Sequence, residues 1–254
     1  MKKRKKLYFA VLMALFTMAL GMNAMAATKV VTMKPNKLYT VNRTSYDDLT
    51  YHKFKVSKPG YITVYGYSYS MYSNNKYSLR VQLYNSRKKP LEQYATSMSE
   101  YSKPAYKTFY AVKQGTYYLG VKDKNYKLKY SFTPVKDRSG ASQAKAVNVN
   151  RNKKGIGLLV AGEKGTKTDW FKIRLTRKQK VTFTFTARAN DHLRLQIVPA
   201  DPKLFIWGSS IYAKSTTEKV TTKDAFPAGT YYIKISRMLT GDKDTSGYYS
   251  FSWR

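Results

Sequence analysis

The chain has 254 residues, no cysteine and a formal net charge of +33, because 47 Lys and Arg stand against 14 Asp and Glu. The absence of cysteine excludes a disulfide framework and thiolate chemistry, so stability must come from packed apolar cores. A positive charge this large exceeds what solubility requires and indicates surroundings rich in polyanions.

The first 26 residues have the order of a secretory signal peptide. Five basic residues lie within residues 1–6, an apolar run follows over residues 7–20, and Ala24-Met25-Ala26 supplies the small residues of a cleavage site. The run is shorter than the roughly 20 apolar residues that span a bilayer, so it predicts export with cleavage after Ala26. No later segment is apolar for long enough to cross a membrane. We therefore expect a secreted protein, held near the cell wall by its charge.

The positive charge of the mature chain is spread evenly. Residues 27–135 carry 19 Lys and Arg against 5 Asp and Glu, and residues 136–254 carry 23 against 9, which leaves +14 on each half. A uniform excess favours general attraction to anionic wall polymers over one charged groove. Export and the lack of a recognised motif argue against a specific nucleic-acid partner.

Residues 27–135 are expected to form a first antiparallel β-sandwich. Segments such as 51–56, 79–83, 115–121 and 126–132 alternate apolar and polar residues, as strands with one buried face do. Turn-forming residues such as Lys58-Pro59-Gly60 separate them. No segment shows a sustained helical period.

Tyrosine is concentrated in this first half, where 18 of the 24 tyrosines lie between Tyr39 and Tyr130. Flat rings with a hydroxyl suit stacking on sugar rings or gripping a protein surface. The alternative is a tyrosine ladder that stabilises the outer face of the sheet through cross-strand pairs. A strand break at Gly66 would also put the tyrosines before it and after it on different faces. The candidate ligand-binding residues share odd parity along one expected strand: Tyr61, Tyr65, Tyr67 and Tyr69.

A polar segment over residues 136–144 is expected to be a linker, and residues 145–254 a second sandwich. Leu79-Arg80-Val81-Gln82-Leu83 recurs as Leu193-Arg194-Leu195-Gln196-Ile197, and the segment 115–121 recurs as 229–235, both 114 residues further on. Equal spacing predicts two tandem copies of one all-β module. A single large sandwich made of both halves is the alternative.

Three motifs of the second half resemble the bacterial pre-peptidase C-terminal domain. They are Asp169-Trp170-Phe171-Lys172-Ile173, the segment 226–233 with Phe-Pro-Ala-Gly-Thr-Tyr-Tyr-Ile, and Gly247-Tyr248-Tyr249-Ser250-Phe251. The first half resembles that family more loosely. The resemblance implies a jelly-roll-like β-sandwich that serves as an accessory or binding module and has no catalytic residues. No peptidase precedes the modules here, and the acidic loops with which some relatives bind calcium are sparse.

Side chains for catalysis or metal binding are few. His52 and His192 are the only histidines, they fall in different halves, and neither lies in a nucleophile or metal-ligand spacing. The close acidic pairs, Asp47-Asp48 and Asp242 with Asp244, fit solvated turns better than a calcium site with six to eight oxygens. We therefore expect no enzyme activity, no cofactor and no metal.

These observations together predict a secreted or cell-surface, non-catalytic binding or adhesion protein. The partner is expected to be a carbohydrate, an anionic wall polymer or an extracellular protein. The alternative is an accessory or inhibitory protein that acts with a separately encoded secreted peptidase.

Overall fold

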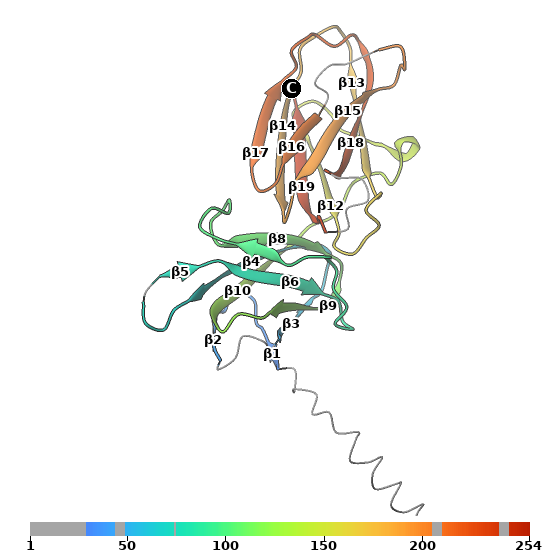
Figure 1. Cartoon of the computed structure of the whole chain (residues 1–254). Coiled ribbons are helices and arrows are strands. Elements are labelled where there is room, and N and C mark those ends of the chain that lie inside the picture. The colour runs from blue at the N-terminus through green and yellow to red at the C-terminus, as the bar shows by residue number, and fades with distance from the viewer. Residues whose placement is uncertain (1–28, 44–48, 74, 205–209, 239–243) are drawn as a thin grey trace, which may run out of the picture.

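The computed structural model describes residues 29–43, 49–73, 75–204, 210–238 and 244–254. The predicted signal peptide lies outside these residues. Within them the regular elements are strands, apart from one 3-10 turn, η1 (Gln143–Lys145). This confirms the all-β fold, and Figure 1 shows two sandwiches packed end against face. No helix in the described part of the chain is long and apolar enough to span a membrane.

The first sandwich consists of two sheets that face each other across one apolar core. One sheet has the order β1-β3-β9-β6-β7, with β1 (Val30–Thr32), β3 (Thr50–Val56), β9 (Gly115–Val121), β6 (Leu79–Tyr84) and β7 (Thr96–Met98). The other has the order β2-β10-β4-β5, with β8 also paired to β4, and contains β2 (Tyr39–Asn42), β10 (Asn125–Pro134), β4 (Gly60–Tyr69), β5 (Lys76–Tyr77) and β8 (Lys107–Val112).

The second sandwich also encloses one core between two sheets. Its five-stranded sheet has the order β11-β13-β18-β15-β16, with β11 (Val147–Asn148), β13 (Asp169–Leu175), β18 (Gly229–Arg237), β15 (Leu193–Pro199) and β16 (Ser210–Ala213). Its four-stranded sheet has the order β12-β19-β14-β17, with β12 (Lys154–Leu159), β19 (Gly247–Trp253), β14 (Thr182–Ala189) and β17 (Thr217–Thr221).

Alternation of side chains explains how these strands build the cores. In β13, Phe171, Ile173 and Leu175 are buried, whereas Lys172 and Arg174 between them are exposed. Burying such a side chain contributes about 1.5–3 kcal/mol, which makes this register strongly preferred over a one-residue slip. Most neighbouring strands are antiparallel. The edge pairs β1–β3 and β11–β13 are parallel instead.

Gly66 lies in the middle of β4 and on its core-facing side, and the strand continues through it. A Cβ atom at this position would lie 2.7 Å from Leu79 Cδ2 and 2.9 Å from the carbonyl oxygen of Lys127 on β10. The missing side chain therefore lets β4 approach its neighbours closely and keeps the parity of the residues on either side.

Replacing Gly66 with Ala is expected to destabilise the first sandwich by about 1–2 kcal/mol, because Leu79 or the β10 backbone must shift to admit the methyl group. Urea unfolding followed by tyrosine circular dichroism would measure this change. Thr63→Ala, on the outer side of the same strand, is the matched control and should change stability much less. Equal stability of Gly66→Ala and wild type would contradict the close packing described here.

The two sandwiches share a buried apolar contact. Ala111 of β8 packs with Leu158 and Val160 of the second sandwich, and Val135 and Tyr248 border this cluster. The amide of Ala161 donates a hydrogen bond to the carbonyl oxygen of Ala111 at 2.9 Å. The two sandwiches are therefore docked through backbone as well as side chains.

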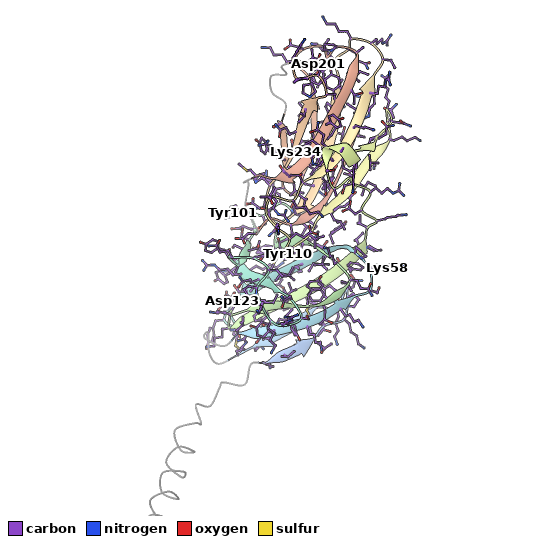
Figure 2. All side chains as sticks on the ribbon, turned by 90° about the vertical axis from the view of Figure 1, so that its right-hand side faces the viewer. Lys58, Tyr101, Tyr110, Asp123, Asp201 and Lys234 are labelled. Atoms are coloured by element: carbon purple, nitrogen blue, oxygen red, sulfur yellow. The ribbon has the colours of Figure 1, made fainter. Side chains whose placement is uncertain are left out.

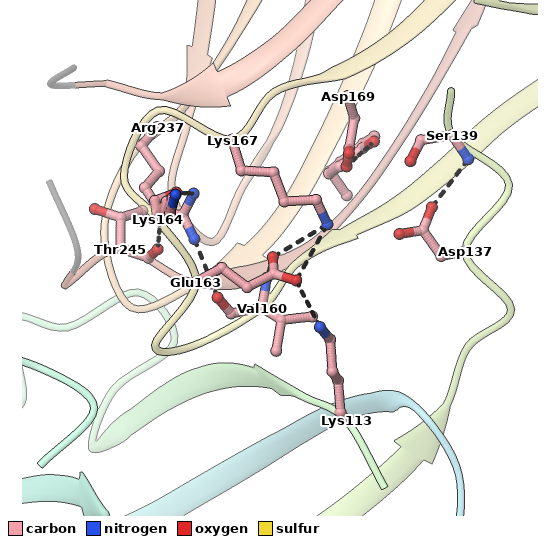
Figure 3. Close-up of polar contacts among 11 residues, drawn as sticks. Lys113, Asp137, Ser139, Val160, Glu163, Lys164, Lys167, Asp169, Arg237 and Thr245 are labelled. Carbon is pink, nitrogen blue, oxygen red and sulfur yellow. Dashed lines mark hydrogen bonds and ion pairs between the residues drawn. The ribbon is translucent and has the colours of Figure 1, made fainter. Parts of the chain in front are cut away.

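Polar groups surround this apolar contact. Lys113 of the first sandwich and Lys167 of the second both pair with Glu163, at 3.0 and 3.1 Å (Figure 3). Burial alone would raise the pKa of Glu163, but the two ammonium groups outweigh it and hold that pKa below its ordinary value. On the other side, the side-chain amide of Asn190 donates to the buried carboxyl of Glu92 at 2.9 Å. Glu163, Asn190 and one carboxyl oxygen of Glu92 thus have partners across or beside the junction.

The segment 136–144 is hydrogen-bonded to the second sandwich. Gly140 and Trp170 exchange two backbone hydrogen bonds of 2.9 and 3.0 Å, and the amide of Arg138 donates to the carbonyl oxygen of Ile156 at 3.1 Å. This segment therefore runs along the edges of β13 and β12. Independent folding of the two halves stays a prediction.

Candidate functional site

Three of the four candidate tyrosines share one surface. Tyr65, Tyr67 and Tyr69 alternate with core-facing positions of β4 and lie on the outer face of its sheet, each partly exposed. Their common parity holds because β4 passes through Gly66 without a break.

Tyr61 lies apart from these three, at the junction between the sandwiches. Its ring stacks on that of Tyr248, with centroids 5.1 Å apart and planes inclined by 24°. Phe109 lies beside it, with ring centroids 6.3 Å apart. One face of Tyr61 is therefore occupied by the second sandwich, and the structure does not bring this residue together with the other candidates.

A fourth ring, from Tyr106, completes the surface. Tyr65 and Tyr67 meet edge to face at 5.8 Å, and Tyr67 and Tyr106 do so at 5.9 Å. Tyr106 follows the 99–105 loop, and its carbonyl oxygen accepts a hydrogen bond from the amide of Gly66 at 3.0 Å. Edge-to-face pairs of this kind contribute about 0.5–1.5 kcal/mol each beyond burial, so the rings hold one another in place.

Lysines from the two strands that neighbour β4 in its sheet, β5 and β10, lie over these rings. Lys76 of β5 places its ammonium 4.8 Å from the Tyr67 centroid, and Lys129 of β10 lies 5.7 Å from that of Tyr65. Lys127 of β10 lies 5.8 Å from the Tyr69 ring. Cross-strand register places Lys129 opposite Tyr65 and Lys127 opposite Tyr67, and from there Lys127 reaches the diagonal neighbour Tyr69. We call the following set the tyrosine–lysine face: Tyr65, Tyr67, Tyr69, Tyr106, Lys76, Lys127 and Lys129.

A groove of about 530 Å³ runs along one end of this face, bordered by Tyr67, Tyr69 and the turn after β4. Tyr72 in that turn is 100% exposed, and Met71 beside it is also exposed. No acidic residue is among the described residues that line the groove. A volume of this size falls in the range of small-ligand sites, which is about 300–1,000 Å³.

The chemistry of this face is that of a stacking platform with cations. An exposed ammonium–ring contact is worth about 0.5–1 kcal/mol, so a lysine can leave its ring for a stronger partner at small cost. A ligand that offers both an apolar ring face and hydroxyl or anionic groups would use the tyrosines and the lysines together. The residues that define this face include no carboxyl, imidazole or thiol group.

Sequence patterns alone did not single out Tyr106, Lys76 or Tyr72. Tyr106 reaches the face through a loop, and only the β4–β8 pairing places that loop beside Gly66. Alternation in β10 did place Lys127 and Lys129 on an outer face. That alternation did not predict that β10 would pair with β4.

The two histidines have unrelated surroundings. His52 is fully buried in β3, and its Nε2 shares a 2.7 Å hydrogen bond with the hydroxyl of Tyr126. Burial, and then the charges of Arg43 and Lys29, lower the pKa of His52 to about 4. His192 is exposed and pairs with Asp191 at 3.1 Å. Neither contact joins a histidine to a nucleophile.

Acidic side chains are dispersed in the described part of the chain, where no group of three His, Cys, Asp or Glu could hold a metal ion. Asp47, Asp48 and Asp242 lie outside the described residues. Asp169 is buried at the start of β13 and accepts a 2.7 Å hydrogen bond from the Tyr249 hydroxyl. Burial, and then the nearby charge of Asp137, raise the pKa of Asp169 to about 6.

Fold and surface thus define an all-β protein with an aromatic, cationic outer face. No protein-family model matches the chain, and no curated protein matches it. Solved structures similar to it include the pre-peptidase C-terminal domain of a collagenase from Bacillus anthracis, with 14% identity over 43% of this chain and 94% of that domain and a TM-score of 0.34.

Two further solved structures cover more of the chain. The CUB1-EGF-CUB2 region of human MASP-1/3 has 9% identity over 86% of this chain and 100% of that one, with a TM-score of 0.24. The CBM22-1-CBM22-2 tandem of Xyn10C from Paenibacillus barcinonensis has 11% identity over 87% of each chain and the same TM-score. Because all three TM-scores lie below 0.5, none of them assigns this chain to a family.

Proposed function

We propose that the protein is an exported, non-catalytic binding protein that holds a cell-surface or extracellular polysaccharide against its tyrosine–lysine face. The observation that carries this proposal is the array of four tyrosine rings with lysine ammonium groups above them. Tyrosine rings stack on the apolar faces of sugars, and the ammonium groups donate to hydroxyl or anionic substituents.

Net charge supplies a second, less specific attraction. The chain after residue 26 carries +28, and this charge draws the protein toward anionic wall polymers. Attraction between exposed charges is screened beyond a Debye length of about 8 Å at physiological ionic strength. Ring stacking is screened little, so salt separates the two contributions.

The triple variant Tyr65→Ala/Tyr67→Ala/Tyr69→Ala is expected to lose binding to its polysaccharide about tenfold or more in 1 M salt, because three ring contacts disappear. The measurement is a depletion assay of the mature protein on insoluble peptidoglycan, chitin and cellulose. In low salt, retention of the same variant on immobilised teichoic acid should stay close to wild type.

The corresponding triple Phe variant is the matched control, because it keeps the rings and the packing of the face. It should retain most of the high-salt binding. Equal binding by the Ala variant and wild type in 1 M salt would show that the tyrosines only stabilise the sheet. Failure of wild type to bind any polysaccharide in high salt would contradict the ligand class.

A further inference from the structure

The two sandwiches enclose a cleft of about 370 Å³ that is separate from the tyrosine–lysine face. One wall is formed by β7, the 99–106 loop and the start of β8, and the other by β16 and the turn that leads into β17. Figure 2 shows Tyr101, on the first wall, at the level where the sandwiches meet. Clefts between domains are common places for small-ligand sites.

Both walls are fixed by hydrogen bonds within their own sandwich. In the first, the amide of Tyr106 donates to the Ser99 carbonyl oxygen at 2.7 Å, and the Ser99 amide donates to the Ser102 hydroxyl at 2.9 Å. In the second, the amide of Ala189 donates to the Lys214 carbonyl oxygen at 2.9 Å. A ligand would therefore meet a preformed cleft and order little backbone on binding.

The floor is fixed by the contact between the sandwiches. Asn190 lines the cleft, and its side-chain amide donates to Glu92 of the first sandwich at 2.9 Å and to the Asp244 carbonyl oxygen at 2.6 Å. The Asn190 side-chain oxygen accepts from the Ser246 amide at 2.7 Å. Docking of the sandwiches thus sets the distance between the two walls.

Each wall contributes an exposed tyrosine. Tyr101 of the first wall is 85% exposed, and Tyr212 of the second is 43% exposed. Rings that remain in water leave apolar surface for a ligand to cover. Hydroxyl side chains also line the cleft, from Thr96, Ser97 and Ser102 of the first sandwich and from Ser215 and Thr216 of the second.

The charges at the cleft favour an anion. Lys103, Lys107 and Lys214 line it, and Glu218 is the one carboxylate among the described lining residues. Asp191, outside the lining, pairs with Lys214 at 3.7 Å. On the first wall Lys103 and Lys107 line the cleft, and the Glu100 carboxylate interacts with the Tyr101 hydroxyl. An acidic group on a ligand would pair with the two lysines.

We propose that this cleft is a second binding site and takes a saccharide that carries carboxylate or phosphate groups. Tyr101 and Tyr212 would contact the sugar ring from opposite walls, and Lys103 and Lys107 would pair with the acidic group. The site requires both sandwiches, which gives their docking a role in binding.

The test is calorimetric titration of the mature protein with three probes: a tetragalacturonate, its methyl ester and a phosphate-bridged wall oligosaccharide. Wild type should bind at least one of the acidic probes and bind the ester several-fold more weakly. Preference between the carboxylate and phosphate probes identifies the source of the anion. Binding of none of them, or equal binding of acid and ester, would overturn the proposal.

Variants separate this site from the tyrosine–lysine face. Tyr101→Ala/Tyr212→Ala should weaken acidic-probe binding about tenfold or more, whereas Tyr94→Ala, at a 70% exposed tyrosine outside the cleft, should not. Lys103→Gln/Lys107→Gln should remove the preference for acid over ester. The triple Ala variant of Tyr65, Tyr67 and Tyr69 should bind the acidic probes like wild type. If the triple variant loses acidic-probe binding and the Tyr101/Tyr212 variant keeps it, the acidic saccharide binds at the tyrosine–lysine face and not in the cleft.

Discussion

Acidification from pH 7 to pH 4 is expected to destabilise the first sandwich by about 3 kcal/mol through His52 alone. The unfolded chain protonates this histidine near its ordinary pKa of 6.5, but burial and the charges of Arg43 and Lys29 lower the folded-state pKa to about 4. Protons therefore bind the unfolded chain more strongly. The stabilisation is present above pH 6.5 and is lost as the pH falls through 4.

Asp169 gives the second sandwich the opposite dependence. The raised pKa of about 6 means that its folded state favours the protonated carboxyl. Its contribution is therefore fully present below the ordinary value near 4 and is lost as the pH rises through 6. Acid should thus remove stability from the first sandwich at His52 and add stability to the second at Asp169. In the first sandwich the buried carboxyls of Glu92 and Asp123, whose pKa values burial raises, act in the direction opposite to His52.

The chain offers a direct way to observe the contribution of His52. All three tryptophans, Trp170, Trp207 and Trp253, belong to the second half, whereas most tyrosines belong to the first. Urea unfolding at pH 7 and pH 4, followed by tryptophan fluorescence and by tyrosine circular dichroism, reports on each sandwich. His52→Gln should remove about 3 kcal/mol of the pH dependence seen by tyrosine, and His192→Gln, at an exposed site, should not. An unchanged pH dependence in His52→Gln would refute the assignment to His52.

Alternation along single strands was enough to predict the class of fold and the residues that face the cores. In β13 the apolar members of the alternation, Phe171, Ile173 and Leu175, are all buried, and Lys172 and Arg174 between them are exposed. Period-two patterning predicts the core residues because one face of each sheet is buried against the core. It also placed Tyr65 and Tyr67 on one outer face.

Pairing between distant strands was beyond such patterns. Nothing in the sequence of β4 indicates that Lys129 lies opposite Tyr65, or that Tyr61 meets Tyr248 some 190 positions later. These contacts depend on sheet order and on docking of the two sandwiches, which arise from long-range packing. The meeting of Tyr101 and Tyr212 at one cleft was equally unpredictable, because no local signal joins a loop of the first half to strand β16 of the second.

Val160→Asp is expected to uncouple the two sandwiches. Val160 is buried against Ala111 and Leu158, and its backbone carbonyl oxygen accepts a hydrogen bond from the Arg237 guanidinium at 3.0 Å. Desolvating a new carboxylate in this apolar cluster costs about 3 kcal/mol or more even beside such a cation, and separation of the sandwiches would return that charge to water. Small-angle X-ray scattering should show a larger radius of gyration, and urea unfolding should split into two transitions.

Two comparisons decide whether the effect belongs to the junction. Val220→Asp places the same charge on β17, where valine is 40% exposed, and should leave scattering and unfolding close to wild type. Ala111→Asp introduces the carboxylate from the first sandwich and should reproduce the behaviour of Val160→Asp, because both enter one apolar cluster. If Val160→Asp only unfolds the second sandwich while Ala111→Asp leaves the particle compact, the contact does not hold the halves together. If both variants separate the halves, they should also lose acidic-saccharide binding, since the walls of the cleft are then no longer held at a fixed distance.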